Sequence, residues 1–357
     1  MAIQKITVDQ FIAIKDTMPV LDVRSPGEYT HAHIPGAYSL PLFTDEERKV
    51  VGTAYKQQHK QTAIKIGLDY FGVKMKKMVE ETERLMAAFF STSTSSNISG
   101  SVVVHCWRGG MRSAGVAWLL ELYGYKVYTI TGGYKAYRKW VRNKFAEEHH
   151  LKVLGGYTGS AKTIVLQQLL NAGMPVIDLE NMANHKGSAF GALGQAPQPS
   201  QEMFENLLAE ALHKVKDDKN TPAFIEDESQ RIGKLIIPNE FWNQLRNSEI
   251  IFLDIPFEKR LDYLAAEYGK FEKEKLVNAV MRIQKRLGGM ETKNAINCLL
   301  EDNHKECFRI LLKYYDKLYH KGLHNRPHLH TLLRKIIFDR VDAPAISNNL
   351  MHEKSFQ

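Results

Sequence analysis

The amino-acid sequence predicts two α/β domains in succession, followed by a helical and basic C-terminal part. Two observations support this fold class. Short runs of β-branched and apolar residues alternate with amphipathic helical segments, which is the pattern of parallel sheets covered by helices on both faces. The chain has 357 residues, a length that favours two domains over one.

The first predicted domain covers residues 1–142, and its strands are short and apolar. In chain order we expect a strand–helix unit over 6–14, a strand over 20–23, a turn-rich stretch over 24–37, a polar helical insertion over about 44–90, a Ser/Thr-rich loop over 91–97, strands over 101–104 and 126–130, and a glycine turn at 132–134 that leads into a basic helix.

A charged stretch over 143–150 is expected to link the two domains, and the second domain covers 151–357. Its expected strands lie over 151–154, 175–178, 223–226 and 249–254, with helices between them such as 204–215. Residues 257–340 are expected to be mostly helical and are rich in Lys, Arg and Tyr.

Composition limits the classes of function. The formal net charge of +8 favours polyanionic partners such as nucleic acid. No apolar stretch approaches the roughly 20 residues needed to cross a bilayer, and the N-terminus lacks the apolar region of a signal peptide, so a cytoplasmic location is expected. The three cysteines show no metal-ligand spacing, which fits a reducing compartment. Cys298 and Cys307 are expected to be buried, small apolar residues.

The stretch His105-Cys-Trp-Arg-Gly-Gly-Met-Arg-Ser113 places Cys106 between a predicted strand and a predicted helix that starts at Ser113. Arg108 and Arg112 supply positive charge, and the two glycines let the backbone curl so that its amides face inward. Such surroundings lower the pKa of a thiol and bind an anion above the sulfur. We therefore expect Cys106, Arg108 and Arg112 to be catalytic.

Residues 1–140 resemble the rhodanese domain. The resemblance rests on Leu21-Asp-Val-Arg-Ser-Pro-Gly-Glu-Tyr29, His33-Ile-Pro-Gly-Ala37, the Cys106 loop and Gly132-Gly-Tyr134. It implies that Cys106 carries a persulfide or a related chalcogen, and that Asp22 and Arg24 support the loop. Five residues separate Cys106 from Arg112, whereas the usual sulfurtransferase loop has four; the wider spacing is that of rhodanese-like phosphatases. Loop length thus leaves sulfur and phosphate chemistry both open, and favours an anion at least as large as phosphate.

The turn Gly155-Gly-Tyr-Thr-Gly-Ser-Ala-Lys-Thr163 follows a strand and precedes a helix, as a P-loop requires. Ala161 stands where the motif has glycine, which is costly only if that position needs a positive φ. The residues expected to bind phosphate or diphosphate are Gly156, Thr158, Gly159, Ser160, Ala161, Lys162 and Thr163.

Acidic residues follow the predicted strands of the second domain, at the sheet edge where ligands bind in open α/β folds. They include Asp178, Glu180, Glu226 and Asp227. One of them is expected to hold Mg²⁺ together with Thr163. The sequence does not select which, and the identity of any metal stays open.

The whole chain resembles the tRNA 2-selenouridine synthases. Beyond the two loops, the resemblance rests on Asp45-Glu-Glu-Arg48, Val51-Gly-Thr-Ala-Tyr-Lys-Gln57, Asp178-Leu-Glu180, His185-Lys-Gly-Ser-Ala-Phe-Gly191, Gln198-Pro-Ser-Gln201, Phe204-Glu-Asn206 and Glu226-Asp-Glu-Ser229. It implies a transferase that attaches a geranyl group from geranyl diphosphate to wobble 2-thiouridine of tRNA and then replaces the geranylated sulfur with selenium from selenophosphate. No tightly bound cofactor is expected, and a selenophosphate-producing enzyme is an expected transient partner.

Within this resemblance, His185 and Ser188 are expected to support the site. The basic C-terminal part is expected to contact tRNA through Arg282, Lys285, Arg286 and Lys313. Two other classes of function remain: a rhodanese-like phosphatase or plain sulfurtransferase with a regulatory P-loop domain, and a nucleotide-sensing or RNA-binding module without catalysis.

Overall fold

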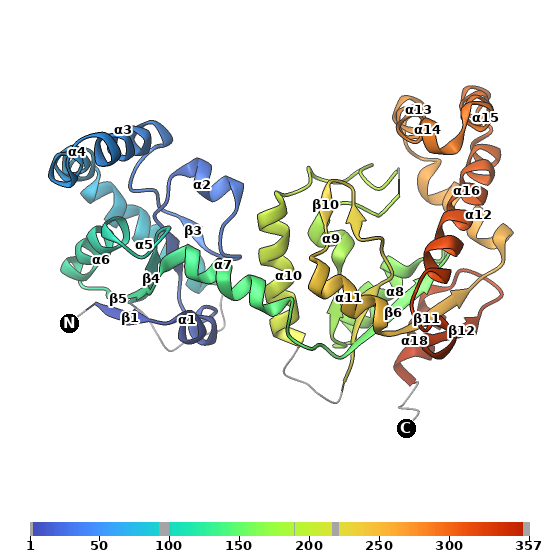
Figure 1. The fold of residues 1–357 in the computed structure, drawn as a ribbon, viewed down its shortest axis with the longest axis horizontal. Coiled ribbons are helices and arrows are strands. Elements are labelled where there is room, and N and C mark those ends of the chain that lie inside the picture. Colours follow the sequence, from blue (N-terminus) through green and yellow to red (C-terminus); the bar gives the residue numbers. More distant parts are fainter. Residues whose placement is uncertain (1–2, 93–99, 189, 216–220, 353–357) are drawn as a thin grey trace. The chain divides into compact units, whose positions relative to one another are not determined.

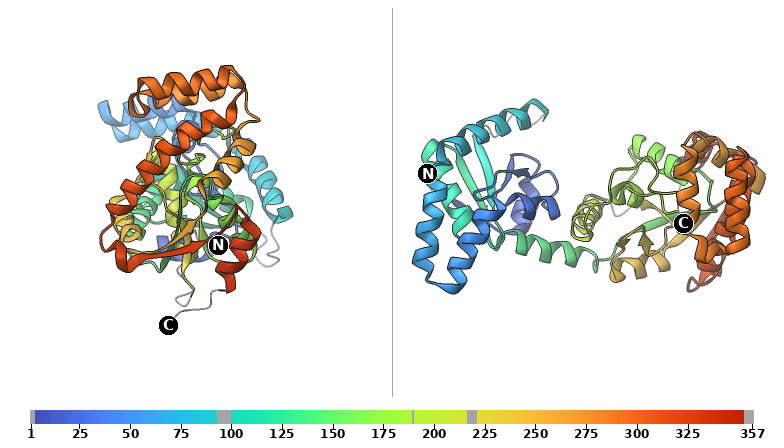
Figure 2. Two further views of the ribbon diagram at one scale, coloured as in Figure 1. Left: turned by 90° about the vertical axis from the view of Figure 1, so that its right-hand side faces the viewer. Right: turned by 90° about the horizontal axis from the view of Figure 1, so that it is seen from above.

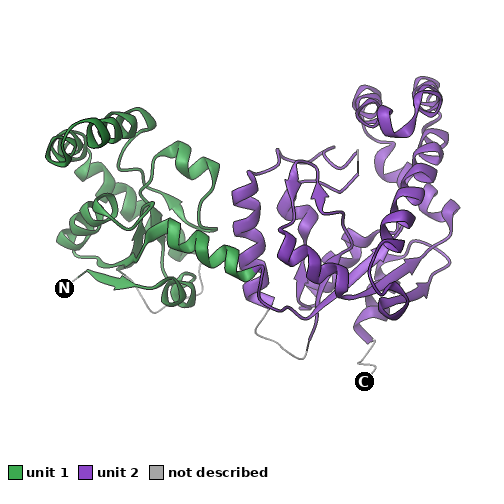
Figure 3. Ribbon diagram, viewed as in Figure 1, with its two compact units in different colours: residues 1–144 green, residues 145–357 purple. Residues whose placement is uncertain are grey.

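The computed structural model describes residues 3–92, 100–188, 190–215 and 221–352. The chain divides into two compact units, residues 1–144 and 145–357 (Figure 3). This division falls within the stretch 143–150 that was expected to link two domains. Among the described residues, no helix combines the length and apolar character that a membrane span requires.

Unit 1 is built on five parallel strands in the order β1-β5-β4-β2-β3. The central strand β4 is buried at every position because it pairs with β5 on one side and β2 on the other. Its carboxyl end delivers Cys106 to the sheet edge. The two-residue strand β3 directly follows the stretch 24–37 that was expected to be turn-rich, and it was not predicted. The strands are β1 Gln4–Ile6, β2 Val20–Asp22, β3 Tyr38–Ser39, β4 Ser101–His105 and β5 Lys126–Ile130.

The helices of unit 1 cover this sheet, and three of them form the expected insertion (Figure 1). Figure 2 shows α3 and α4 side by side, and α5 packs Met78, Leu85 and Met86 into the core. Of the loop predicted over 91–97, residues 91 and 92 belong to α5, and the rest lies outside the described residues. The helices are α1 Val8–Ile14, α2 Pro26–His31, α3 Asp45–Gln57, α4 Lys60–Gly72, α5 Met75–Thr92, α6 Met111–Tyr123 and α7 Gly133–Lys144.

Unit 2 is built on a second parallel sheet, in the order β12-β11-β6-β8-β7, with a separate hairpin of β9 and β10. Strand β6 is central and leads into the glycine-rich turn. Residues 257–340 are mostly helical, as predicted, but they also contain the strand β12, which pairs with β11 at the edge of the sheet. The strands are β6 Leu151–Gly156, β7 Val176–Ile177, β8 Ala223–Glu226, β9 Arg231–Ile232, β10 Leu235–Ile236, β11 Glu249–Asp254 and β12 Leu333–Ile337.

The C-terminal helices of unit 2 have a hydrophobic core of their own, which includes Leu276, Leu299 and Phe308. Cys307 is buried there, as predicted, and burial raises the pKa of its thiol to about 12. Cys298 is only half-buried. The helices are α8 Lys162–Asn171, α9 Leu179–Ala183, α10 Gln201–Val215, α11 Asn239–Asn247, α12 Phe257–Tyr268, α13 Lys273–Arg282, α14 Gln284–Leu287, α15 Gly289–Leu300, α16 His304–His324, α17 Leu329–Leu332 and α18 Ala343–His352.

Candidate functional site

The Cys106 loop runs from the end of β4 into α6, which starts at Met111, two residues before the predicted start at Ser113. Cys106 is 3% exposed. Its Sγ lies 3.2 Å from Oγ of Ser113, and the backbone amides of Ser113 and Gly110 also interact with it. The sulfur therefore sits at the positive end of α6, surrounded by hydrogen-bond donors.

These surroundings favour the thiolate. Burial by itself raises the pKa of Cys106, but hydrogen bonds from Ser113, the charge of Arg112 and the Gly110 amide outweigh burial and lower the pKa below that of an ordinary thiol. A cysteine with a lowered pKa at the start of a helix has the character of a nucleophile.

The two arginines of the loop differ in their contacts. Arg108 is exposed. Nη1 of Arg112 donates to Oε2 of Glu28 at 2.8 Å, and the same carboxylate oxygen accepts from Nε of Arg48 at 2.8 Å. Glu28 thus fixes Arg112 beside the sulfur. Sequence reasoning did not select Glu28 or Ser113, although both lie in the motifs that carry the rhodanese resemblance.

Asp22 and Arg24 form a fully buried ion pair at the end of β2. Nη2 of Arg24 lies 2.6 Å from Oδ2 of Asp22 and also donates to the carbonyl of Ala32 at 2.7 Å. The guanidinium stacks 3.8 Å from the ring centre of Tyr134, at the start of α7. Because Tyr134 N–H in turn donates to the carbonyl of Cys106 at 2.9 Å, this ion pair is connected to the loop through α7.

Gly133 permits this close approach of α7 to the loop. A Cβ atom at Gly133 would lie 2.3 Å from the carbonyl oxygen of Cys106, and its φ is +56°. The carbonyls of Cys106 and Trp107 accept from the amides of Tyr134 and Lys135, both at 2.9 Å. The loop therefore directs carbonyl groups toward α7 while its amides face the sulfur.

The lowered pKa of Cys106 predicts a pH titration that can be measured. We expect the thiolate absorbance lost in a Cys106→Ser variant to titrate below the pH range of an ordinary thiol and of Cys298, whose pKa burial raises. Ser113→Ala should shift the Cys106 midpoint to higher pH, because it removes a hydrogen bond to the thiolate. A Cys106 midpoint equal to that of Cys298 would contradict the geometry of the loop.

The glycine-rich turn runs from the end of β6 into α8. Nζ of Lys162 donates to the carbonyl of Gly156 at 2.7 Å, so the lysine bends back over the turn. Gly159 has φ +85°, and a Cβ there would lie 2.9 Å from the carbonyl of Arg260. This strand, turn and helix form the backbone arrangement of a phosphate-binding loop.

Ala161 adopts φ +55° and ψ +28°, so the position does require the left-handed conformation that favours glycine. The alanine lies 8% exposed within the core beside α8. The departure from the motif is therefore a source of backbone strain, on the order of 1 kcal/mol.

Ala161→Gly is expected to raise the free energy of unfolding by up to about 1 kcal/mol, because relief of the strain exceeds the added chain entropy. Gly159→Ala should lower it, since the new Cβ would meet the Arg260 carbonyl. Urea denaturation of both variants measures these changes in the free energy of unfolding. Changes of the same sign in the two variants would contradict the backbone conformations described for Gly159 and Ala161.

Residues from the C-terminal helices support the P-loop. Arg260 donates to the carbonyl of Thr158 at 3.0 Å and is paired with Asp316 on α16. The hydroxyl of Tyr319, also on α16, accepts from the Gly156 amide at 3.1 Å and donates to Oδ2 of Asp227 at 2.6 Å. Asp227 is further paired with Arg326. Arg260 is buried, so its charge lies inside the unit and not on the basic surface.

Three carboxylates converge beside Lys162 and Thr163. Thr163 Oγ1 donates to Oε2 of Glu180 at 2.6 Å, and the Glu180 amide donates to Oε1 of Glu226 at 2.6 Å. Glu228 is hydrogen-bonded to Glu180. Burial, followed by the neighbouring negative charges, raises the pKa of Glu226 and of Glu228 well above the ordinary value.

The remaining acidic candidates have structural partners. Asp178 caps α9 by accepting from the Asn181 amide at 2.9 Å, and Asp227 is held by Tyr319. Glu180 is thus the carboxylate in contact with Thr163. Within the described ranges, no three His, Cys, Asp or Glu side chains are arranged to hold a metal ion by themselves.

The P-loop opens onto a cavity of about 590 Å³. Polar residues of its lining include Lys162, Thr163, Glu180 and Glu228. The lining also includes aromatic and aliphatic side chains from α11, α12 and α16, beside the cations Arg246 and Arg286; these apolar residues are Trp242, Tyr263, Tyr314, Tyr315, Leu318 and Leu323. A ligand in this cavity would meet both phosphate-binding groups and apolar side chains.

The other predicted residues of unit 2 surround this cavity to different degrees. Ser188 and Arg286 line it, whereas Lys285 lines a separate groove. His185 is half-buried, and burial followed by the charge of Arg282 lowers its pKa. Lys313 is exposed on α16 and lines neither.

Comparison with known proteins agrees with these two units. Residues 7–139 match the model of the rhodanese-like domain, and residues 149–335 match the model described as the tRNA 2-selenouridine synthase AAA domain. The chain belongs to the tRNA 2-selenouridine synthase family.

Individual members of the tRNA 2-selenouridine synthase family match over most of the chain. The protein of that name from Sulfurovum sp. is 35% identical, and the match covers 86% of this chain and 89% of the relative. The protein from Bdellovibrio bacteriovorus is 32% identical, and the match covers 95% of this chain and 98% of the relative. The Nitrosomonas europaea protein is 39% identical over 71% of this chain, and the match spans 64% of its own length.

Proposed function

We propose that this chain converts wobble 2-thiouridine in tRNA to 2-selenouridine through an S-geranylated intermediate, acting in the cytoplasm. The observation that carries the proposal is the cavity whose lining combines a phosphate-binding loop with aromatic and aliphatic side chains. A diphosphate attached to a short hydrocarbon chain likewise combines an anionic part with an apolar part. The name shared by the relatives supplies the tRNA substrate and the selenium chemistry.

In the first step, the P-loop amides and Lys162 hold the diphosphate of geranyl diphosphate. The sulfur of 2-thiouridine attacks C1 of the geranyl group, the C1–O bond breaks, and diphosphate leaves with the electron pair. Lys162, whose Nζ donates to the Gly156 carbonyl in the turn, stabilises the charge that develops on the leaving group. The geranyl chain packs against Tyr314, Tyr315 and Leu318, gaining about 0.8 kcal/mol for each buried methylene.

The residues beside the P-loop fit a magnesium ion bound together with the diphosphate. Thr163 and Glu180 offer the hard oxygen ligands that Mg²⁺ prefers, and Oε2 of buried Glu226 has no hydrogen-bond partner among the described residues. Thr163 and Glu180 would hold the ion, which would supply positive charge for the departing diphosphate.

In the second step, the Cys106 loop receives selenophosphate. Its inward amides and Arg112 bind the phosphoryl group, and the wide loop accommodates an anion of this size. Selenium replaces sulfur at C2 of the uridine, geranylthiol leaves, and water releases phosphate. We assign the release of selenium to the Cys106 thiolate: its sulfur attacks phosphorus of selenophosphate, the P–Se bond breaks, and the selenide set free is the group that attacks C2, while water cleaves the S–P bond on Cys106 to give phosphate. The selenophosphate-producing enzyme is proposed as a transient partner.

The proposal is tested with purified protein and tRNA that carries wobble 2-thiouridine. With geranyl diphosphate alone, mass spectrometry of the digested nucleosides should show the S-geranyl product. Addition of selenophosphate should convert that product to 2-selenouridine. If neither donor, alone or in combination, alters the 2-thiouridine, the proposed function is wrong.

A further inference from the structure

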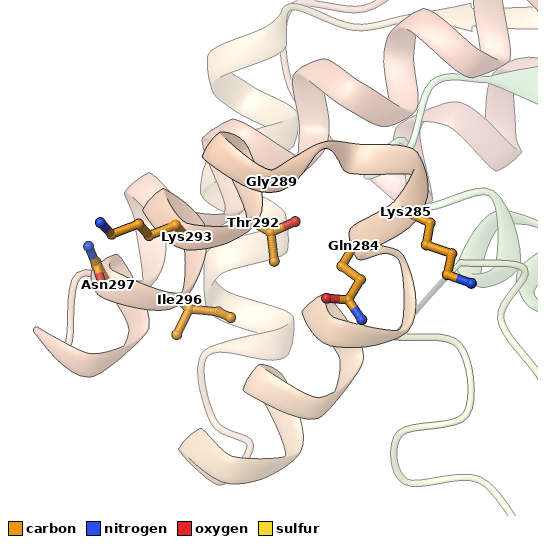
Figure 4. Close-up of a pocket in the computed structure, with 7 residues that line it drawn as sticks. All are labelled: Gln284, Lys285, Gly289, Thr292, Lys293, Ile296 and Asn297. Atoms are coloured by element: carbon orange, nitrogen blue, oxygen red, sulfur yellow. The ribbon is translucent and has the colours of Figure 1, made fainter.

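A groove of about 630 Å³ lies on the helical part of unit 2, between α14 and α15. Lys285 and Lys293 stand at its two ends, and Gln284, Thr292 and Ile296 lie between them (Figure 4). Gln284 and Asn297 add amide groups that donate and accept hydrogen bonds. The groove, defined by these residues and Gly289, therefore combines two separated positive charges with neutral polar groups.

The cations around the groove differ from three other lysines of the C-terminal helices. Lys273 is paired with Asp302 at 2.8 Å, Lys275 with Glu272 at 2.9 Å, and Lys305 with Asp262 at 2.6 Å. By contrast, a group of cations from α13 to α15 makes no ion pair within the described part of the chain: Arg282, Lys285, Arg286 and Lys293. Glu291 is the single carboxylate in the sequence from 282 to 297.

Helix α14 separates the groove from the P-loop cavity. Gln284 and Lys285 line the groove, while Ile283 and Arg286 line the cavity that holds Lys162. Consecutive residues of one short segment thus face two neighbouring sites. An elongated polyanion that follows the unpaired cations would pass from the groove to the mouth of the cavity.

We propose that the groove binds the phosphodiester backbone of the tRNA and brings the anticodon to the P-loop cavity. The identity of the polyanion as tRNA rests on the proposed function. Lysines near a backbone contribute charge without reading sequence, and amide side chains bind sugar and phosphate oxygens. This assignment adds Lys293 to the cations expected from the sequence to contact tRNA. It gives no tRNA-binding role to Lys313, which lines neither the groove nor the P-loop cavity.

The test compares two double variants with the same change of charge. Lys285→Gln/Lys293→Gln alters the groove and leaves the P-loop cavity untouched. Lys273→Gln/Lys275→Gln removes two lysines that are already ion-paired. Fluorescence anisotropy with tRNA should show weaker binding for the groove variant, by about tenfold at moderate salt, and a dependence of log Kd on log salt that is smaller in slope by about 1 to 2. The control variant should match the unmodified protein in both measurements.

A second measurement separates this inference from the proposed function. Geranylation of free 2-thiouridine nucleoside, which has no backbone, should proceed equally in the unmodified protein and the groove variant. If the unmodified protein binds no tRNA, the proposed function fails. If the unmodified protein binds tRNA and the two variants have equal affinity and equal salt dependence, the groove assignment is overturned and the groove serves a partner other than RNA.

Discussion

Replacing Lys162 by alanine lowers the rate of geranyl transfer by about 100- to 1000-fold, the loss expected when one group that stabilises developing negative charge is removed. Lys162 is the cation at the start of α8, and its Nζ already lies over the phosphate-binding turn. The measurement is the single-turnover rate of S-geranyl nucleoside formation. Conversion of separately prepared S-geranyl tRNA with selenophosphate should be retained, because that step is assigned to the Cys106 loop.

The matched control for this variant is Lys275→Ala. Lys275 lies in the same unit, is paired with Glu272 and lines neither the cavity nor the groove. Its replacement should leave geranyl transfer unchanged. Equal rates for the Lys162 and Lys275 variants would show that the P-loop does not hold the leaving group.

Cys106→Ser is expected to abolish selenium incorporation while geranylation continues, so that S-geranyl tRNA accumulates. Serine preserves the size of the side chain and can hydrogen-bond with Ser113, but its hydroxyl is not ionised at neutral pH. The measurement is the ratio of S-geranyl to selenium-containing nucleoside when both donors are present. Loss of both steps would contradict the division of chemistry between the two loops.

Cys298→Ser provides the comparison, because Cys298 is a half-buried cysteine remote in sequence from the loop. It should support both steps at the rate of the unmodified protein. The same pair of variants also examines the phosphatase alternative, in which Cys106→Ser would remove hydrolysis of a phosphate ester and leave tRNA unaltered in every sample.

Local patterns predicted much of the fold. The strands Ala223–Glu226 and Glu249–Asp254 match the prediction because each is a compact apolar run that ends at an acidic residue. Strand β12 was not predicted: it is an edge strand whose sequence, Leu-Arg-Lys-Ile-Ile, lacks regular alternation and lies among long helical segments. Its pairing with β11 is a tertiary contact, which no local pattern reveals.

The candidate site was predictable to the extent that its residues are close in sequence. The order strand, cysteine, glycines, arginine and helix located the Cys106 loop, and Lys162 and Thr163 located the P-loop. The pairing of Arg112 with Glu28, and of Gly156 with Tyr319, joins positions far apart in the chain. Likewise, the sequence could not show whether alanine at position 161 strains the backbone. That depends on the φ angle of Ala161, which only the structure gives.

The supports of the P-loop have a consequence for how unit 2 can be divided. Gly156 and Thr158 are held by Tyr319 and Arg260, and Arg260 is held in turn by Asp316. Helix α16 thus supports the phosphate-binding loop and also lines the cavity in front of it. The glycine-rich motif therefore cannot be separated from the C-terminal helices. A fragment that ends after β11 would keep every residue of the motif but lose Arg260 and Tyr319, the side chains that hold its backbone. Phosphate affinity and the order of α16 should rise and fall together, as properties of one cooperative unit.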